Sequence, residues 1–249
     1  MPITAQSIVQ RATLIAQDVT SVRWSARELT RWLNDAQREV VMFRPDSTAT
    51  AVVATPVPGT AATRQTLANM SGVVNPAKLI DVTRNMAASG SYRSVRLVSR
   101  EIMDSQFPGW HAAAAAIDTI HFIFDNRDPL AFYLYPQPTA ATRLEVIYAA
   151  FPTAIALPAE GVILTAALSD TDTSVVAGNV ALPDTYANAL LDYVLYRAYL
   201  KDSDYAGNVQ RAQAHYAAFA NSLGMDAKTL FAAGPVANAP GNPNVIPQA

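Results

Sequence analysis

Apolar residues near both ends of the chain recur at helical spacing. Ile8, Ala12, Ile15 and Val19 are separated by four, three and four positions, which places them on one face of a helix. Similar spacing follows in three further segments, one near the N-terminus and two near the C-terminus. We expect helices at residues 4–19, 26–44, 184–200 and 204–223.

The start of the second helix has a recognisable local pattern. Ser25 and Glu28 form an S-x-x-E capping box, in which each side chain binds a free amide of the first turn. Trp24 before the box and Leu29 after it form the accompanying hydrophobic pair. Pro45 ends the helix, because the residue before a proline is displaced from helical geometry.

The third helix, at 184–200, is apolar on nearly every side. A helix without a polar face is buried on more than one side. We therefore expect the four helices to pack into one bundle although they lie far apart in the sequence. Trp24 and Trp32 are expected to be largely buried there.

Between residues 49 and 152 the apolar pattern changes to a period of two. Short runs rich in Val, Ile, Tyr and Phe alternate with Pro, Gly and Asn, which is typical of a small antiparallel sandwich or barrel. A short helix at 99–106 interrupts them, and residues 112–116 fit a strand or a helix equally well. The expected strands are 49–55, 64–67, 79–86, 92–97, 119–124, 130–135 and 142–148.

These elements predict an α+β protein with a discontinuous helical domain. A polar connection at 158–182 is expected to form a hairpin or arm. In the segment from Gly234 to Ala249, 9 of 16 residues are Pro, Gly or Asn, which indicates an extended tail. The predicted domains are a helical bundle of residues 1–47 and 183–224, a β-rich domain of residues 48–157 inserted between its halves, the 158–182 connection and a tail at 225–249.

The composition suggests that other chains cover part of this surface. Of the 249 residues, 51% are hydrophobic and 15% are charged, whereas about a quarter of a typical soluble protein is charged. The net charge of −2 argues against a general nucleic-acid binder or a ligand of anionic membranes. There is no cysteine, and we find neither a signal segment nor a membrane span, so we expect folding in the cytoplasm.

The charges are unevenly distributed along the chain. Residues 1–110 hold 12 basic and 8 acidic side chains, and residues 111–249 hold 6 basic and 12 acidic ones. Of the 18 cations, 15 are Arg, which is preferred at protein interfaces. The asymmetry is either chance or the mark of a subunit that assembles head to tail.

No pattern in the sequence requires an enzyme. His111, His121 and His215 share no spacing typical of metal ligands, and we expect structural or surface roles for them. No nucleophile elbow, phosphate-binding loop or dinucleotide fingerprint is present. We predict no catalytic, metal or cofactor-binding residue, and no cofactor.

Two sets of carboxylates were weighed for chemistry. Asp170 with Asp172, and Asp202 with Asp204, lack the rest of a calcium loop and are expected to be solvated turns. Glu101 and Asp104, three apart on the short helix, could form a glycosidase pair. The surrounding sequence shows no sign of a sugar cleft.

Four stretches of the sequence together resemble the head-to-tail adaptor (connector) family of tailed bacteriophages. They are residues 24–39 (WSARELTRWLNDAQRE), 44–46 (RPD), 79–82 (LIDV) and 186–198 (YANALLDYVLYRA), and the likeness spans roughly residues 3–223. The resemblance implies a helical layer from both chain ends with an inserted β-rich domain. It also implies a virion protein, made in the host cytoplasm, that forms a ring of twelve copies below the portal.

The resemblance further implies three kinds of partner. They are further copies of the chain, the phage portal protein and a downstream tail or nozzle protein, while DNA passes through the lumen without sequence-specific binding and no membrane is bound. On this view arginines of one subunit meet acidic residues of the next, and the tail docks on the portal. The expected inter-subunit residues are Arg27, Arg31, Arg38, Asp192, Asp202 and Asp204, and the expected docking residues are Leu230, Phe231, Pro235, Val245 and Ile246.

Two alternatives remain open from the sequence. The chain could be a peptidoglycan-cleaving tail component that uses Glu101 or Asp104. It could also be a cellular β-sandwich binding module flanked by helices.

Overall fold

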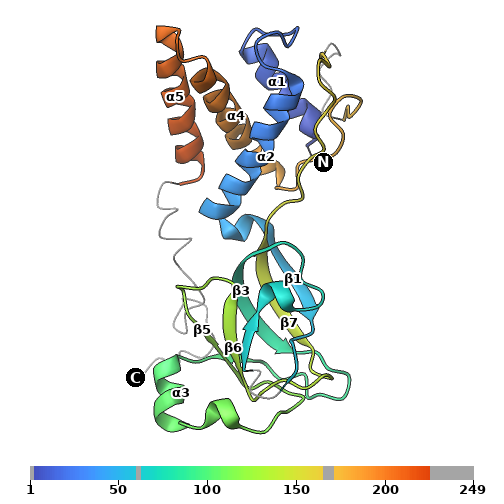
Figure 1. The fold of residues 1–249 in the computed structure, drawn as a ribbon, viewed down its shortest axis with the longest axis vertical. Coiled ribbons are helices and arrows are strands. Elements are labelled where there is room, and N and C mark those ends of the chain that lie inside the picture. The colour runs from blue at the N-terminus through green and yellow to red at the C-terminus, as the bar shows by residue number, and fades with distance from the viewer. Residues whose placement is uncertain (1–2, 60–62, 165–170, 225–249) are drawn as a thin grey trace, which may run out of the picture. The chain divides into compact units, whose positions relative to one another are not determined.

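The computed structural model describes residues 3–59, 63–164 and 171–224, which form two compact units. One unit combines residues 3–47 with residues 151–224 and is helical, and the other comprises residues 48–150 and is built from strands (Figure 1). The protein is therefore α+β, as the sequence predicts. Each unit is described separately below.

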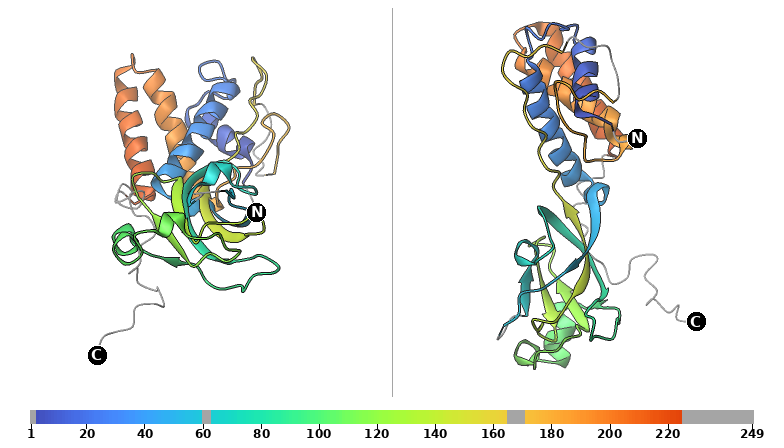
Figure 2. Two further views of the ribbon diagram at one scale, coloured as in Figure 1. Left: turned by 60° about the horizontal axis from the view of Figure 1, so that its bottom comes forward. Right: turned by 90° about the vertical axis from the view of Figure 1, so that its right-hand side faces the viewer.

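Both ends of the chain supply helices to the helical unit. Figures 1 and 2 show α1 and α2 beside α4 and α5, although these pairs are far apart in the sequence. α4 packs against each of the other three helices, so its apolar residues are covered from several sides. The four helices are α1 (Ala5–Ile15), α2 (Ala26–Phe43), α4 (Ala187–Lys201) and α5 (Ala206–Ser222).

The first helix is shorter than the sequence predicts. It ends at Ile15 because Gln17 adopts a left-handed backbone with φ of 58°. The N–H groups of Gln17 and Asp18 bind the carbonyls of Leu14 and Thr13, which is a Schellman motif with glutamine in place of the usual glycine. Val19, expected on the helix face, lies instead in the connection to α2.

The two tryptophans of the α2 region differ in burial. Trp24 is 3% exposed, as predicted, whereas Trp32 is partly buried. Trp32 lies near the outward side of α2, next to the exposed Arg31. The apolar period of α2 was correct, but it did not indicate how wide the covered face is.

The described residues of the expected hairpin or arm at 158–182, which are 158–164 and 171–182, contain no strand. These residues run irregularly along the helical unit and are fixed by side chains of α1 and α2. The Gln6 carbonyl oxygen accepts the N–H groups of Val175 and Val176 at 2.7 and 3.0 Å. On α2, the side-chain oxygen of Gln37 accepts the N–H of Ala181 at 3.1 Å. The side chains of the helices therefore provide the partners that a second strand would have provided.

The β unit contains two sheets. One has the strand order β1-β7-β3 and the other has the order β2-β6-β5-β4. Their pairs are antiparallel, except that β4 runs parallel to β5. The strands are β1 (Ala49–Ala54), β2 (Arg64–Thr66), β3 (Pro76–Asn85), β4 (Arg96–Leu97), β5 (His121–Phe124), β6 (Ala131–Tyr135) and β7 (Leu144–Ala150).

The sheets depart from the prediction in two places. The expected strand 92–97 begins only after Tyr92, which takes a left-handed backbone with φ of 54°, and it changes partner along its length. Ser94 bridges Arg84 of β3, and only Arg96–Leu97 pair with β5 as β4. The sheets also do not close into a barrel. Residues 112–116, left open by the sequence, begin in the short helical turn Trp110–Ala112 and continue as an irregular segment that bridges Ala116 to Pro138.

The core of the β unit lies between the sheets. Phe122, Phe132, Leu134, Leu144 and Val146 are its central residues, and each is at most 1% exposed. A smaller cluster forms where the predicted short helix, α3 (Arg100–Gln106), places Met103 against Trp110 and Ile123. In the described part of the chain, no helix has the length and hydropathy that a membrane span requires.

Candidate interaction surfaces

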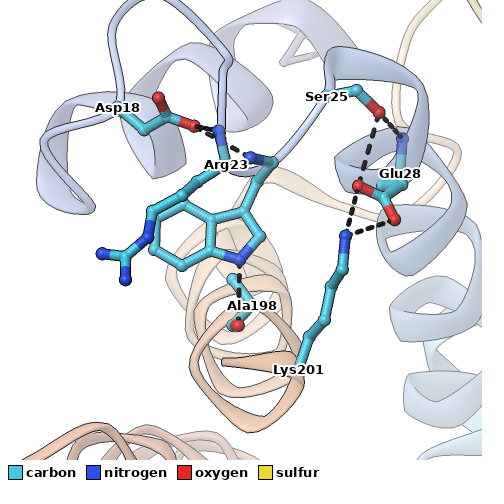
Figure 3. Close-up of polar contacts among 7 residues, drawn as sticks. Asp18, Arg23, Ser25, Glu28, Ala198 and Lys201 are labelled. Atoms are coloured by element: carbon cyan, nitrogen blue, oxygen red, sulfur yellow. Dashed lines mark hydrogen bonds and ion pairs between the residues drawn. The ribbon is translucent and has the colours of Figure 1, made fainter. Parts of the chain in front are cut away.

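A single carboxylate organises the connection between α1 and α2. Asp18 is 8% exposed, and its two oxygens accept the backbone N–H groups of Val22, Arg23 and Trp24 at 3.0, 2.9 and 2.9 Å (Figure 3). Bonds to a charged acceptor are stronger than neutral ones, so three of them give this short segment one conformation. The α1–α2 connection therefore has one defined conformation.

Trp24 attaches this connection to the end of α4. Its indole Nε1 donates to the carbonyl of Ala198 at 3.0 Å, and its ring packs edge-on against Tyr199 (Figure 3). A buried indole N–H needs a partner, and the last turn of a helix has free carbonyls to offer. The tryptophan therefore joins residues 174 positions apart in the chain.

Two ion pairs add to the same attachment. Lys201 donates to both oxygens of Glu28 at 2.7 and 2.9 Å (Figure 3). Arg23 pairs with Asp202 at 2.6 Å. Ser25 caps α2 as predicted, accepting the N–H of Glu28 at 3.3 Å. The Glu28 carboxylate, predicted to bind the amide of the cap residue, instead accepts from the Ser25 hydroxyl at 3.5 Å and is also bound by Lys201. The charges of this attachment are therefore neutralised within the chain.

Exposed apolar side chains surround this neutralised attachment. Val22 is 83% exposed and Tyr205 is 67% exposed, more than any other large apolar side chain in the described part of the molecule. Large exposed apolar side chains that gather in neighbouring segments mark interaction sites in soluble proteins when they form one patch. We call this set the loop-end surface: Leu14, Ile15, Val19, Val22, Leu200 and Tyr205.

A second exposed surface lies on α5, which packs along α4 and leaves its other side open (Figure 1). The guanidinium of Arg211 lies 5.7 Å from the ring of Tyr199. Arg211 is the one Asp, Glu, Lys or Arg in the α5 sequence, so the open side is nearly free of charge. The exposed residues of this side are Val209, Gln210, Gln213, Ala214, Tyr216, Ala217, Ala218 and Asn221.

The predicted inter-subunit arginines fall into two classes. Arg27 is half-buried and donates to the Pro158 carbonyl of its own chain at 2.9 Å. Arg31 and Arg38 are exposed and lie seven positions apart, so they occupy one side of α2. These two are available to a partner.

The predicted inter-subunit acids divide in the same way. Asp192 lies 2.9 Å from Nδ1 of His215, between α4 and α5. Asp202 is paired with Arg23 and accepts from Asn208 at 2.8 Å. Asp204 is exposed in the α4–α5 connection. The predicted docking residues Leu230, Phe231, Pro235, Val245 and Ile246 lie outside the described residues, as does Asp170.

The carboxylates weighed as a glycosidase pair have ordinary surface partners. The Asp104 carboxylate accepts from Nε1 of Trp110 at 2.9 Å and lies 3.4 Å from Nε of Arg100. The hydrogen bond from Trp110, followed by the charge of Arg100, lowers the pKa of Asp104. A glycosidase general acid needs the opposite shift. Glu101 is exposed on the same helix.

The three histidines lie in three separate environments. His111 stacks on Trp110 and its Nδ1 lies 2.9 Å from the Thr63 hydroxyl, while His215 is paired with Asp192. His121 stacks on Tyr135 in the sheet, and burial followed by the charge of Arg96 lowers its pKa. No group of three or more potential metal ligands occurs among the residues that the structure describes.

The sequence did not single out Asp18 or Lys201. Asp18 follows a helix that ends with glutamine instead of glycine, so the end of the helix was misplaced and the carboxylate was assigned to its last turn. The partner of Lys201 is 173 positions away. No local pattern in the sequence identifies such a contact.

Comparison with known protein families covers nearly the whole chain. The family of the SU10 adaptor protein matches residues 3–241, which is nearly the entire chain. A search among curated proteins found no match. The matched family is one of structural phage proteins, located in the virion, that contact other head and tail proteins. The chain therefore belongs to the SU10 adaptor protein family.

Proposed function

We propose that this protein forms a ring of twelve copies below the portal of a tailed phage, where it links the portal to the tail and continues the DNA channel. The downstream partner is a tail or nozzle protein. The role of the present chain is structural, without catalysis or a cofactor. Membership of the adaptor family supports a position between head and tail.

The observation that carries the ring proposal is the exposed apolar surface of the helical unit. The loop-end surface and the open side of α5 leave large apolar side chains in water, which is unfavourable unless another chain covers them. The attachment by Asp18 and Trp24 fixes the loop-end surface before any partner arrives. A preformed surface loses less conformational entropy on binding.

Charged residues add direction to this contact. Arg31 and Arg38 are exposed on α2, and Asp204 is exposed in the α4–α5 connection, so the two signs lie on different elements of the unit. Contact between different surfaces of successive copies is the geometry that closes a ring. Each exposed pair contributes about 0–1 kcal/mol, so the apolar area provides most of the affinity.

Assembly is tested by mass. We expect light scattering to show the mass of a multimer, either for the protein alone or after the portal protein is added. The double variant Val22→Asp, Tyr205→Asp should abolish multimer formation while leaving the far-UV circular dichroism spectrum unchanged. Val74→Asp is the matched control, because Val74 is 65% exposed in the β unit. A variant that assembles as well as the parent, or a ring whose subunits touch only through their β units, would contradict the proposal.

The channel is proposed to pass DNA without holding it. Every phosphate bound by a cation adds affinity and hence resistance to sliding, and a net charge of −2 suits a lumen without a basic band. We expect the assembled ring to show no tight binding of duplex DNA at physiological salt. Nanomolar binding in a filter or polarisation assay would overturn this part of the proposal.

The segment beyond Gly224 is proposed to dock on the portal. A segment rich in Pro, Gly and Asn is suited to an extended arm that a partner orders. A chain that ends at Gly224 should form its own ring yet bind the portal ring more weakly. Equal binding by the shortened and the full chain would remove the docking role of the arm.

A further inference from the structure

Strand β1 is an open edge of its sheet. It pairs with β7 in an unbroken register from Ala49 opposite Ala149 to Ala54 opposite Leu144. In an antiparallel pair half of the N–H and C=O groups of an edge strand point away from the partner. Just beyond the strand, Thr55 and Ser71 exchange two backbone hydrogen bonds on that outer side, and Gly72 lies so close to Val53 that a Cβ at this glycine would be 3.0 Å from the Val53 carbonyl oxygen. Among the residues that the structure describes, the open part of the edge is therefore 49–52.

This edge also lacks the usual protection against pairing. Edge strands are normally guarded by charges, prolines or bulges. β1 has the sequence ATAVVA with no bulge in its register, and residues 47–63 contain no charged side chain. Ala49, Thr50 and Ala51 are exposed.

The edge strand of the other sheet is different. The Gln65 side chain of β2 accepts the N–H of Val57 at 2.8 Å and donates to its carbonyl at 3.0 Å. One edge of the β unit is therefore covered by its own chain within the described residues, while the edge of β1 is open to an added strand.

The outer face of β1 is apolar as well as open. Val53 is 47% exposed, and Ala51 lies opposite the half-buried Ile147 of β7. An added strand with large apolar side chains on that face would cover all three. An added strand with charged side chains would gain no partner there.

The last helix ends beside Arg44, which shortly precedes this strand in the sequence. Nη1 of Arg44 donates to the carbonyl of Leu223 at 3.3 Å, one residue before Gly224. Arg44 in turn precedes the first residue of β1 by five positions. The C-terminal segment and β1 thus start from one place in the helical unit, whatever the orientation of the β unit.

We propose that the edge of β1 binds residues 229–233 of the same chain as a parallel strand. This run, TLFAA, is the longest stretch of residues 229–249 without proline or glycine, and none of these 21 residues is charged. Thr and Phe favour strands, and Leu230 or Phe231 supplies the apolar side chain that the outer face lacks. Residues 225–228 bridge the gap, since four extended residues span up to about 14 Å.

This inference is independent of the ring and of the portal. It assigns Leu230 and Phe231 to the root of the C-terminal segment and leaves Pro235, Val245 and Ile246 for a partner. The first experiment is amide hydrogen exchange on the full chain. We expect the β1 amides that face away from β7 to be protected, and Phe231→Pro to speed their exchange at least tenfold. Val245→Pro is the control and should leave the exchange rates of these β1 amides unchanged. Neither variant should change the exchange rates of the β3 amides.

A crosslink provides a second measurement, because the chain has no cysteine. Neighbouring strands bring Cα atoms within the range that a disulfide needs. Ala51→Cys with Ala232→Cys should form an intramolecular disulfide on mild oxidation, and Ala51→Cys with Ala249→Cys should not. Unprotected outward amides in the parent chain overturn the proposal. So does a disulfide that joins two chains, which would assign the edge to a second copy.

Discussion

The two units are stabilised by contacts of different range along the chain. In the β unit, β5 and β6 are neighbours in the sequence and pair directly, and the longest-range pair, β1 with β7, places Ala49 opposite Ala149. In the helical unit the decisive contacts join the two ends of the chain, as between Trp24 and Ala198. The helical unit therefore forms only after both of its halves have been synthesised and brought together.

The two units also differ in how they expose apolar side chains. The helical unit concentrates its most exposed ones around a rigid attachment with paired charges, and the β unit leaves one strand edge open. The first arrangement suits contact between preformed surfaces, and the second suits the addition of an extended segment. The comparison teaches that a subunit of low charge can offer two kinds of docking surface at once.

The largest effect is expected at Trp24. Trp24→Ala removes a buried aromatic side chain and its bond to Ala198, and should lower the free energy of unfolding by about 3–5 kcal/mol. Urea unfolding followed by circular dichroism at 222 nm measures the loss. Trp32→Ala is the matched control and should cost less, because Trp32 is half-buried. Equal losses would show that the attachment of α2 to α4 contributes little.

The next effect concerns the carboxylate that orders the α1–α2 connection. Asp18→Asn removes the charged acceptor of three backbone N–H groups and should cost about 1–3 kcal/mol of stability. Asp204→Asn, at an exposed aspartate, should be neutral. Hydrogen exchange should place the lost protection at residues 22–24. An unchanged exchange pattern would mean that the carboxylate does not order the connection.

A pH-dependent effect is expected in the β unit at His121. Burial and the neighbouring Arg96 lower the pKa of His121 below its ordinary value of 6.5, so the unfolded chain binds the proton more readily than the folded one. The stability that this histidine contributes is present above pH 6.5 and decreases as the pH falls below it. His121→Gln should flatten that part of the pH profile, and amides of β5 and β6 should report it. A profile that is the same in both proteins would exclude His121 as the cause.

The smallest effect is expected at the ion pair between α2 and α4. Lys201→Met leaves Glu28 without its partner at a partly exposed site, and exposed pairs contribute about 0–1 kcal/mol. The difference from the parent should shrink in 1 M salt, where such charges are screened. A large loss that salt does not reduce would indicate that Lys201 acts through packing.

The sequence predicted elements better than it predicted their ends. The capping serine of α2 and the proline that follows it are local signals, and they gave the bounds of that helix nearly as the structure has them. The end of α1 was wrong because glutamine took the left-handed position that usually identifies a glycine. The strand expected at 92–97 was too long for a similar reason, since Tyr92 also adopts a left-handed backbone.

For the candidate surfaces, the sequence identified residue types but not their partners. It indicated that arginines and acids would meet, yet it could not show that Arg27, Asp192 and Asp202 are bound within their own chain. Arg31, Arg38 and Asp204 are the members that the fold leaves exposed. Whether a charged residue is bound within its own chain or left exposed depends on which elements pack together. The spacing of residues along the chain does not predict this.

The sequence by itself determined the α+β class, the helices at both ends, the strands between them and the likeness to phage adaptors. These follow from periodicity and capping, which act over a few residues. The tertiary structure alone decided that Asp18 binds three backbone amides, that Trp24 and Lys201 attach α2 to α4, and that β1 has an open edge. For Trp24, Lys201 and the edge of β1 the physical reason is range, because each depends on which distant segments pack together. The bonds of Asp18 are local, but they depend on the left-handed backbone of Gln17, which no residue-type signal in the sequence indicated.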